Sequence, residues 1–107
     1  MGLYNLDKIF SPKSIAVVGA SEKAGTVGEA LIRNLVDGGA TATLYPVNPG
    51  YSEIKGLKAY GSLADIRKEV DLAVIATPIG TVPGIAEECV KNGVGGAIVI
   101  SAGGKEI

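Results

Sequence analysis

The chain has 107 residues, a formal net charge of −1 and 47% hydrophobic residues, which suit one folded domain and exclude a disordered chain. Its charges are dispersed and its apolar runs are short, so we expect no nucleic-acid partner and no membrane segment. It contains no histidine and one cysteine, which excludes a Ser-His or Cys-His catalytic pair and a disulfide framework within the chain and is compatible with a cytoplasmic location.

The first half of the chain alternates between apolar strands and an amphipathic helix. The run at 14–19, rich in β-branched residues, predicts a buried strand. Apolar residues at helical spacing then predict a helix over 27–36, which Gly38 ends. A second strand is predicted over 41–47, and the sequence Asn-Pro-Gly at 48–50 predicts a turn after it.

The second half repeats this alternation. A short third strand is predicted over 56–60, and Ser62 is the expected N-cap of a short helix. Apolar runs at 72–76 and 97–100 predict a fourth and a fifth strand, with a helix over 81–92 between them. Each crossover is long enough for a helix, so the strands are expected to be parallel. The predicted fold class is α/β, with a doubly wound, mainly parallel five-stranded sheet of the Rossmann-like type.

One domain is expected over residues 1–107, because no repeat, low-complexity segment or internal linker interrupts the pattern. The sequence ends three residues after Gly104, where the alternation predicts the start of another helix. We therefore expect the chain to be the N-terminal part of a longer protein.

A glycine-rich loop follows the first predicted strand, and ligands of open α/β sheets bind at such strand ends. The loop leads into a helix, whose N-terminal N–H groups and dipole suit a phosphate. Glycines there allow close backbone approach, while two hydroxyls and one lysine add hydrogen bonds and charge. The candidate binding residues of this loop are Gly19, Ala20, Ser21, Lys23, Ala24, Gly25, Thr26 and Gly28.

The other strand ends carry small, polar or cyclic residues without charge. They offer hydrogen bonds and close backbone approach, but no acid or base, so we expect neither a catalytic residue nor a metal ligand in the chain. Tyr51, after the predicted turn, fits a position over a ligand as well as a position covering the sheet. These further candidates are Asn48, Pro49, Tyr51, Thr77, Pro78, Ser101 and Ala102.

The last predicted helix carries other groups that could react. Cys89 shares a helix face with Val82 and Ile85, which predicts a buried structural thiol. Glu87 and Glu88 are expected on a solvated face.

The spacing of the first loop does not match a dinucleotide-binding motif. Five residues separate Gly19 from Gly25, whereas that motif is G-x-G-x-x-G. Asn48 also stands where an acid would hold the ribose hydroxyls of NAD. No Gly-Lys-Ser/Thr sequence is present, so the loop is not a P-loop. The residues alone thus favour a phosphate-bearing ligand and disfavour NAD.

Five stretches carry a family resemblance: SIAVVGAS (14–21), YPVNP (45–49), GLKAYGS (56–62), DLAVI (71–75) and IVISAG (98–103). Together they resemble the CoA-binding domain of NDP-forming acyl-CoA synthetases, in particular the ADP-forming acetate–CoA ligases. The succinyl-CoA synthetase alpha subunit is related to these enzymes. The resemblance covers nearly the whole chain.

The resemblance implies a function. In this family an acyl-CoA and phosphate give an acyl phosphate and free CoA, and a phosphohistidine then passes the phosphoryl group to ADP or GDP. The chain would hold CoA or acyl-CoA, while ATP or ADP, Mg and the histidine would belong to other domains or subunits of the synthetase. The chain alone is therefore expected to catalyse no acyl-CoA synthesis.

The resemblance also implies roles for the candidate residues. Residues 21–26 would meet the CoA phosphates or ribose, and 48–51 would line the nucleotide. Residues 77–78 and 101–102 would flank the path to the thiol. The related subunit has a lysine near the second turn, where this chain reads Pro-Gly-Tyr at 49–51. Two other functions remain open: a regulatory CoA-binding-like domain of a protein lysine acetyltransferase, and an NAD-binding Rossmann sensor.

Overall fold

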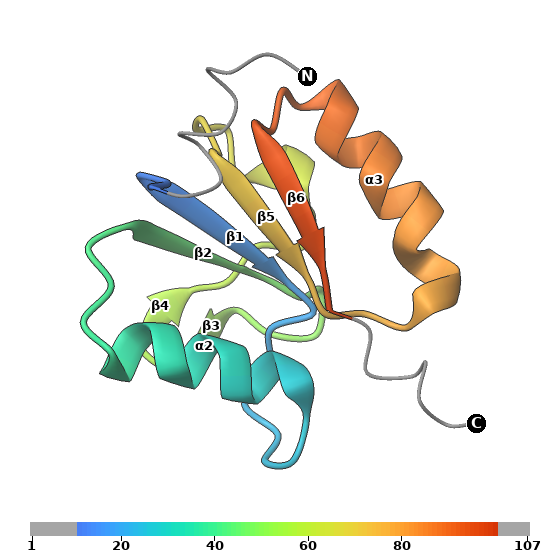
Figure 1. Cartoon of the computed structure of the whole chain (residues 1–107). Coiled ribbons are helices and arrows are strands. Elements are labelled where there is room, and N and C mark those ends of the chain that lie inside the picture. Colours follow the sequence, from blue (N-terminus) through green and yellow to red (C-terminus); the bar gives the residue numbers. More distant parts are fainter. Residues whose placement is uncertain (1–10, 101–107) are drawn as a thin grey trace.

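The computed structural model describes residues 11–100, and a four-stranded parallel sheet runs through its middle (Figure 1). The strands β1 (Ser14–Val18), β2 (Thr43–Val47), β5 (Leu72–Ile75) and β6 (Gly96–Val99) lie in the order β2-β1-β5-β6. The chain moves outward from β1 to β2 and then returns to the other side of β1 to form β5. The strand order therefore reverses between β1 and β5, and α/β sheets bind ligands at the carboxyl ends of the strands at such a point.

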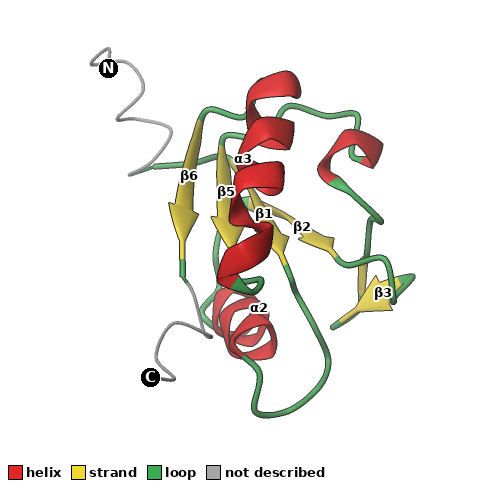
Figure 2. Ribbon diagram, turned by 90° about the vertical axis from the view of Figure 1, so that its right-hand side faces the viewer, coloured by secondary structure: helices red, strands yellow, loops and turns green. Residues whose placement is uncertain are grey.

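Two α-helices cover the sheet, one on each face (Figures 1 and 2). The first, α2 (Val27–Asp37), begins after the N-cap residue Thr26, and the second is α3 (Val82–Lys91). The predicted helices over 27–36 and 81–92 agree with these bounds within one residue. Within the described residues, neither helix has the length and apolar character that a membrane crossing requires.

The core lies on both sides of β1, because successive residues of a strand face opposite ways. Ile15 belongs to a buried cluster with Ile32 of α2 on one face. Ala16 belongs to a second buried cluster, which includes Cys89 of α3, on the other face. The prediction of a doubly wound, Rossmann-like α/β fold is confirmed, as is the prediction of a buried thiol.

The predicted third strand folds into a small hairpin beside α2 instead of joining the main sheet (Figure 1). Strand β3 (Glu53–Ile54) pairs antiparallel with β4 (Leu57–Lys58), and Tyr60 adds one parallel bridge to Val47. A tight turn at residues 55–56 directs the segment back onto β3. The main sheet of the described residues therefore has four strands, and the expected count of five is corrected.

Two short 3-10 turns complete the fold. The helix predicted after Ser62 is the single turn η1 (Leu63–Asp65), and the Ser62 side chain makes no capping hydrogen bond. The other turn, η2 (Ile79–Thr81), leads directly into α3.

Strand β6 is an open edge of the sheet. Its side chains are poorly covered by the described residues: Ile98 is 41% and Val99 is 47% exposed. Among residues 11–100, this edge leaves more apolar side chain exposed than the other strands of the sheet.

Candidate functional site

Two adjoining hollows open at the carboxyl ends of the central strands. The loop hollow, of about 570 Å³, lies between the end of β5 and the first loop (residues 19–26) with the start of α2. The α3 hollow, of about 300 Å³, lies between the end of β2 and α3. The residues that line both hollows are Gly19, Asn48, Thr77 and Pro78. The two hollows therefore meet at the point where the strand order reverses.

Two glycines bring the first loop close to the sheet and to α2. Gly19 has φ +93°, and a Cβ there would lie 2.9 Å from Cγ2 of Thr77. A Cβ on Gly28 would overlap the carbonyl oxygen of Gly19. Only residues without a side chain allow this approach, which sets the N-terminus of α2 against the end of β1.

The start of α2 presents backbone donors to the loop hollow. The Thr26 hydroxyl accepts a hydrogen bond from the Glu29 N–H at 3.2 Å and donates to the Lys23 carbonyl at 2.7 Å. Among residues 11–100, the N–H groups of Val27 and Gly28 have no acceptor, and both residues line the loop hollow. Free N–H groups at the positive end of a helix dipole form a site suited to an anion.

The loop hydroxyls are already used within the protein. Thr26 caps α2, as described above. Ser21 Oγ accepts a hydrogen bond from the Lys23 N–H at 2.9 Å and lies 3.3 Å from the Tyr51 hydroxyl. These hydroxyls hold the shape of the loop, so its donors toward a ligand are mainly backbone N–H groups.

Asn48 joins the second turn to the first loop. Its Nδ2 donates to the Ala20 carbonyl at 2.9 Å, and its Oδ1 accepts from the Gly50 N–H at 2.8 Å. A carboxylate at this position would lose the first bond, because it has no N–H to donate. The bond gives a structural reason for an amide where NAD-binding domains carry an acid.

The end of β5 turns into α3 through a hydrogen-bonded pair of threonines. The Thr81 hydroxyl lies 2.7 Å from both the Thr77 hydroxyl and the Pro78 carbonyl oxygen. Thr77 and Pro78, which were predicted as binding residues, are thereby fixed at the junction of the two hollows.

The α3 hollow includes residues that sequence reasoning did not select. Thr81, Ile85 and Glu88 line it, and their spacing of four and three residues places them on one face of α3. Glu88, predicted to be solvated, is half-buried at this hollow. Its helical spacing from Thr81 is the signal that could have identified it.

The other predicted residues of the described part of the chain line neither hollow. Ala20 is buried, whereas Lys23 and Ala24 are exposed on the first loop. Tyr51 is half-buried against Ser21 and lines neither hollow. Ser101 and Ala102 lie outside the described residues. The predicted residues that line a hollow are Gly19, Ser21, Gly25, Thr26, Gly28, Asn48, Pro49, Thr77 and Pro78.

Two titratable groups near the site have perturbed pKa values. The hydrogen bond with Ser21, aided by one with the Glu22 backbone, lowers the pKa of the Tyr51 hydroxyl. Burial, with a smaller effect of Glu88, raises the pKa of the Cys89 thiol, which keeps it protonated and unreactive. Within the described residues, no group of three His, Cys, Asp or Glu side chains is placed to hold a metal ion.

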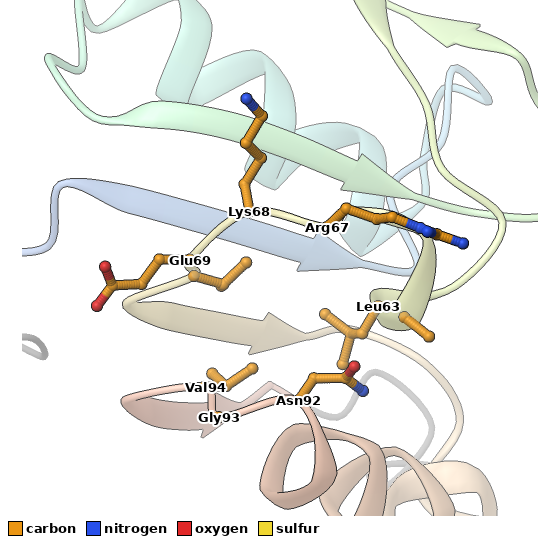
Figure 3. Close-up of a pocket in the computed structure, with 9 residues that line it drawn as sticks. Leu63, Arg67, Lys68, Glu69, Asn92, Gly93 and Val94 are labelled. Atoms are coloured by element: carbon orange, nitrogen blue, oxygen red, sulfur yellow. The ribbon is translucent and has the colours of Figure 1, made fainter.

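A third hollow, of about 390 Å³, lies near the amino ends of β5 and β6 (Figure 3). Its charged side chains, Arg67, Lys68 and Glu69, point away from one another (Figure 3). Ligand sites have polar groups that converge on one centre, and they lie at the opposite ends of parallel strands. This hollow is therefore not a candidate ligand site.

The chain is similar to known proteins over nearly its whole length. The acetate–CoA ligase (ADP-forming) of Methanocaldococcus jannaschii is 47% identical over 104 residues, which are 97% of this chain and 14% of that protein. The alpha subunit of acetate–CoA ligase (ADP-forming) I of Pyrococcus furiosus is 44% identical over 107 residues, covering 96% of this chain and 23% of the subunit. The chain thus spans less than a quarter of the length of either relative.

A solved structure is similar over most of the chain. It is the dinucleotide-forming acetyl-coenzyme A synthetase 1 of Candidatus Korarchaeum cryptofilum in complex with phosphate and ADP. The TM-score is 0.87 at 42% identity, over 92% of this chain and 21% of that one. The family model described as "CoA binding domain" matches residues 13–106. On this match, which spans nearly its whole length, the chain belongs to the family of CoA-binding domains.

Proposed function

We propose that this chain is the CoA-binding part of an ADP-forming acyl-CoA synthetase of the acetate–CoA ligase type. It holds CoA or acyl-CoA while phosphate attacks the thioester to give an acyl phosphate and free CoA. The chain has no histidine, so the phosphohistidine step and the binding of ADP or ATP with Mg²⁺ belong to other domains or subunits. The names of the two curated relatives, and the complex of the solved Korarchaeum structure with phosphate and ADP, support the reaction type.

The observation that carries the proposal is the pair of N–H groups at Val27 and Gly28, which have no acceptor within residues 11–100. They lie at the positive end of α2 and line the larger hollow, where a phosphate group of CoA gains two hydrogen bonds and a favourable dipole. Lys23 supplies a cation on the same loop, and it has no ion-pair partner among residues 11–100. The chain belongs to a family of CoA-binding domains, and CoA carries the phosphates that such a position suits.

The chain's own contribution is binding and orientation. The residues at the junction of the hollows, Gly19, Asn48, Thr77 and Pro78, include no acid or base. They set the path by which the ligand crosses from the α2 side to the α3 side of the sheet. Phosphoryl transfer through a histidine therefore needs groups from the rest of the synthetase.

Calorimetry on the 107-residue chain tests the proposal. CoA should bind measurably, and pantetheine, which lacks the nucleotide and its phosphates, should bind at least about tenfold more weakly, because it cannot reach the N-terminus of α2. NADH is the matched control, since it carries a diphosphate and an adenosine but no pantetheine arm. Tighter binding of NADH than of CoA would overturn the assignment.

A further inference from the structure

A buried acid on α2 is neutralised from the hairpin. Glu29 is 6% exposed, and its Oε2 lies 2.9 Å from Nζ of Lys55, 26 residues further along the chain. Arg33 lies further away, at 3.8 Å, with a half-exposed side chain. The hydrogen bond from Lys55 lowers the pKa of Glu29, although burial opposes it. Lys55 is therefore the main partner that keeps this carboxylate ionised.

The same lysine also holds the first loop. Its backbone N–H donates to Oε2 of Glu22 at 2.8 Å. Lys55 thus bonds through its backbone to the first loop and through its side chain to α2, the two elements that form the loop hollow. We call Glu22, Glu29 and Lys55 the loop clamp.

The backbone of Lys55 has an unfavourable conformation that the clamp explains. Lys55 has φ +53° and Gly56 has φ +79°, so both central residues of the hairpin turn are left-handed. Turns of this kind favour Asn, Asp or Gly at the first position, since a longer L side chain is strained there. The two bonds to Glu22 and Glu29 give a reason for a lysine at this strained position.

The loop clamp acts on the site without touching a ligand. None of its three residues lines either hollow. Glu29 is the third residue of α2, directly after Val27 and Gly28, which line the loop hollow. Glu22 is an acid on a loop proposed to meet phosphates, and its bond to Lys55 ties its carboxylate to the hairpin. The loop clamp therefore fixes the position of the N–H groups of Val27 and Gly28. It also holds the negative charge of Glu22, which would repel a phosphate, against the hairpin.

The geometry points to Lys55 as a positioning residue for the coenzyme: it holds the first loop and the start of α2 in the arrangement that binds the CoA phosphates. This inference rests on the proposed function. Lys55→Met tests it on the 107-residue chain, because methionine keeps most of the side-chain volume and removes the ammonium group. The affinity for CoA should fall about tenfold, the effect of losing the charge-assisted hydrogen bond to Glu29 that holds the start of α2, while the backbone bond to Glu22 remains.

Two matched variants separate positioning from charge. Lys58→Met removes the same charge from the same hairpin, where Lys58 lies over the ring of Tyr60 at 5.1 Å, and it should leave CoA affinity within about twofold. Lys55→Arg keeps a cation that reaches Glu29 and should restore most of the affinity. Equal losses for Lys55→Met and Lys58→Met would overturn the inference, since a general loss of attraction to an anion would explain them.

Amide hydrogen exchange without ligand provides a readout that general destabilisation does not mimic. Lys55→Met should speed exchange at residues 21–28 by at least about tenfold while the amides of β1 and β5 keep their protection. A uniform increase across the sheet would show a merely structural role and overturn the inference. Should Lys55→Met fail to fold, Glu29→Gln with Lys55→Met leaves no unpaired buried charge, and this double variant should fold but still bind CoA weakly.

The outcomes for function and for positioning are distinct. Wild-type protein that shows no CoA binding would refute the proposed function, and with it the coenzyme role of Lys55. Wild-type protein that binds CoA, with Lys55→Met binding equally well, would refute only the positioning role.

Discussion

The carbonyl oxygen of Gly19 occupies the space where a Cβ of Gly28 would stand, so β1 and α2 meet with no side chain between them. This contact places the first N–H groups of α2 at the carboxyl end of the sheet, where the loop hollow opens. The position of the proposed anion site therefore depends on the absence of one methyl group.

Gly28→Ala is expected to destabilise the protein and to abolish CoA binding. The new methyl group would meet backbone rather than a flexible side chain, so α2 must move, at a cost of about 1–3 kcal/mol in the free energy of unfolding. Gly84→Ala is the control, because nothing lies within 4 Å of its Cβ position on α3. That change should stabilise the protein by up to about 1 kcal/mol. Urea unfolding and CoA calorimetry test the two variants. Unchanged CoA binding by Gly28→Ala would contradict the proposed site at the start of α2.

Asn48→Asp is expected to weaken both the fold and CoA binding without creating an NAD site. The change removes the hydrogen bond from Nδ2 to the Ala20 carbonyl and places a negative charge beside that carbonyl oxygen. The free energy of unfolding should fall by about 1–3 kcal/mol. Asn34→Asp on the exposed side of α2 makes the same chemical change and should cost less than about 1 kcal/mol. Calorimetry with CoA and with NADH measures both expected effects on binding. A gain of tight NADH binding would contradict the prediction and would show that the amide alone selects against NAD.

The Glu29–Lys55 pair is expected to make stability depend on acid pH. The pKa of Glu29 is lowered in the folded protein, first by the hydrogen bond from Lys55. The contribution of the ionised Glu29 to stability is therefore complete above the ordinary carboxyl pKa of 4.5. This contribution is lost as pH falls through the lowered pKa of the folded protein. In urea unfolding at a series of pH values, wild type should lose more stability than Glu29→Gln on acidification. Parallel curves for the two proteins would contradict the ion pair.

Cys89 is expected to react slowly with thiol reagents in the folded protein. The side chain is 6% exposed, and its burial raises the pKa of the thiol, so little thiolate is present near neutral pH. A chromogenic disulfide reagent at pH 8 should label the folded chain at least about tenfold more slowly than the same chain in urea. Equal rates in the two conditions would show that α3 does not cover the thiol.

The order of the main elements could be predicted because each is encoded by neighbouring residues. The run at 14–19 and the helical spacing at 27–36 carry their own signals, and both elements form where they were expected. The hairpin was predicted as a strand of the main sheet, because its pairing depends on only two residues in each strand and on a left-handed lysine. Residue types alone do not specify such a turn.

The candidate site could be predicted only as a set of strand ends. The glycines and Asn48 were identified because strand ends meet at one edge of a parallel sheet, and the structure brings them together there. The long-range hydrogen-bond partners of individual side chains could not be predicted from the sequence. Ser21 and Thr26 bond within the protein, and Lys55 finds Glu29 across 26 residues of sequence. The Thr26 bonds span three residues and are local, whereas the contacts of Ser21 with Tyr51 and of Lys55 with Glu29 depend on tertiary packing, which no local pattern records.

The backbone donors of the loop hollow have a consequence for how the site tolerates mutation. Val27 and Gly28 offer main-chain N–H groups, and these persist whatever side chain is shortened nearby. Systematic replacement by alanine would leave most such donors in place, so it would detect this site poorly, whereas added bulk or a proline would block or delete a donor directly. A substitution that changes only a side chain around the loop hollow would therefore leave these donors in place.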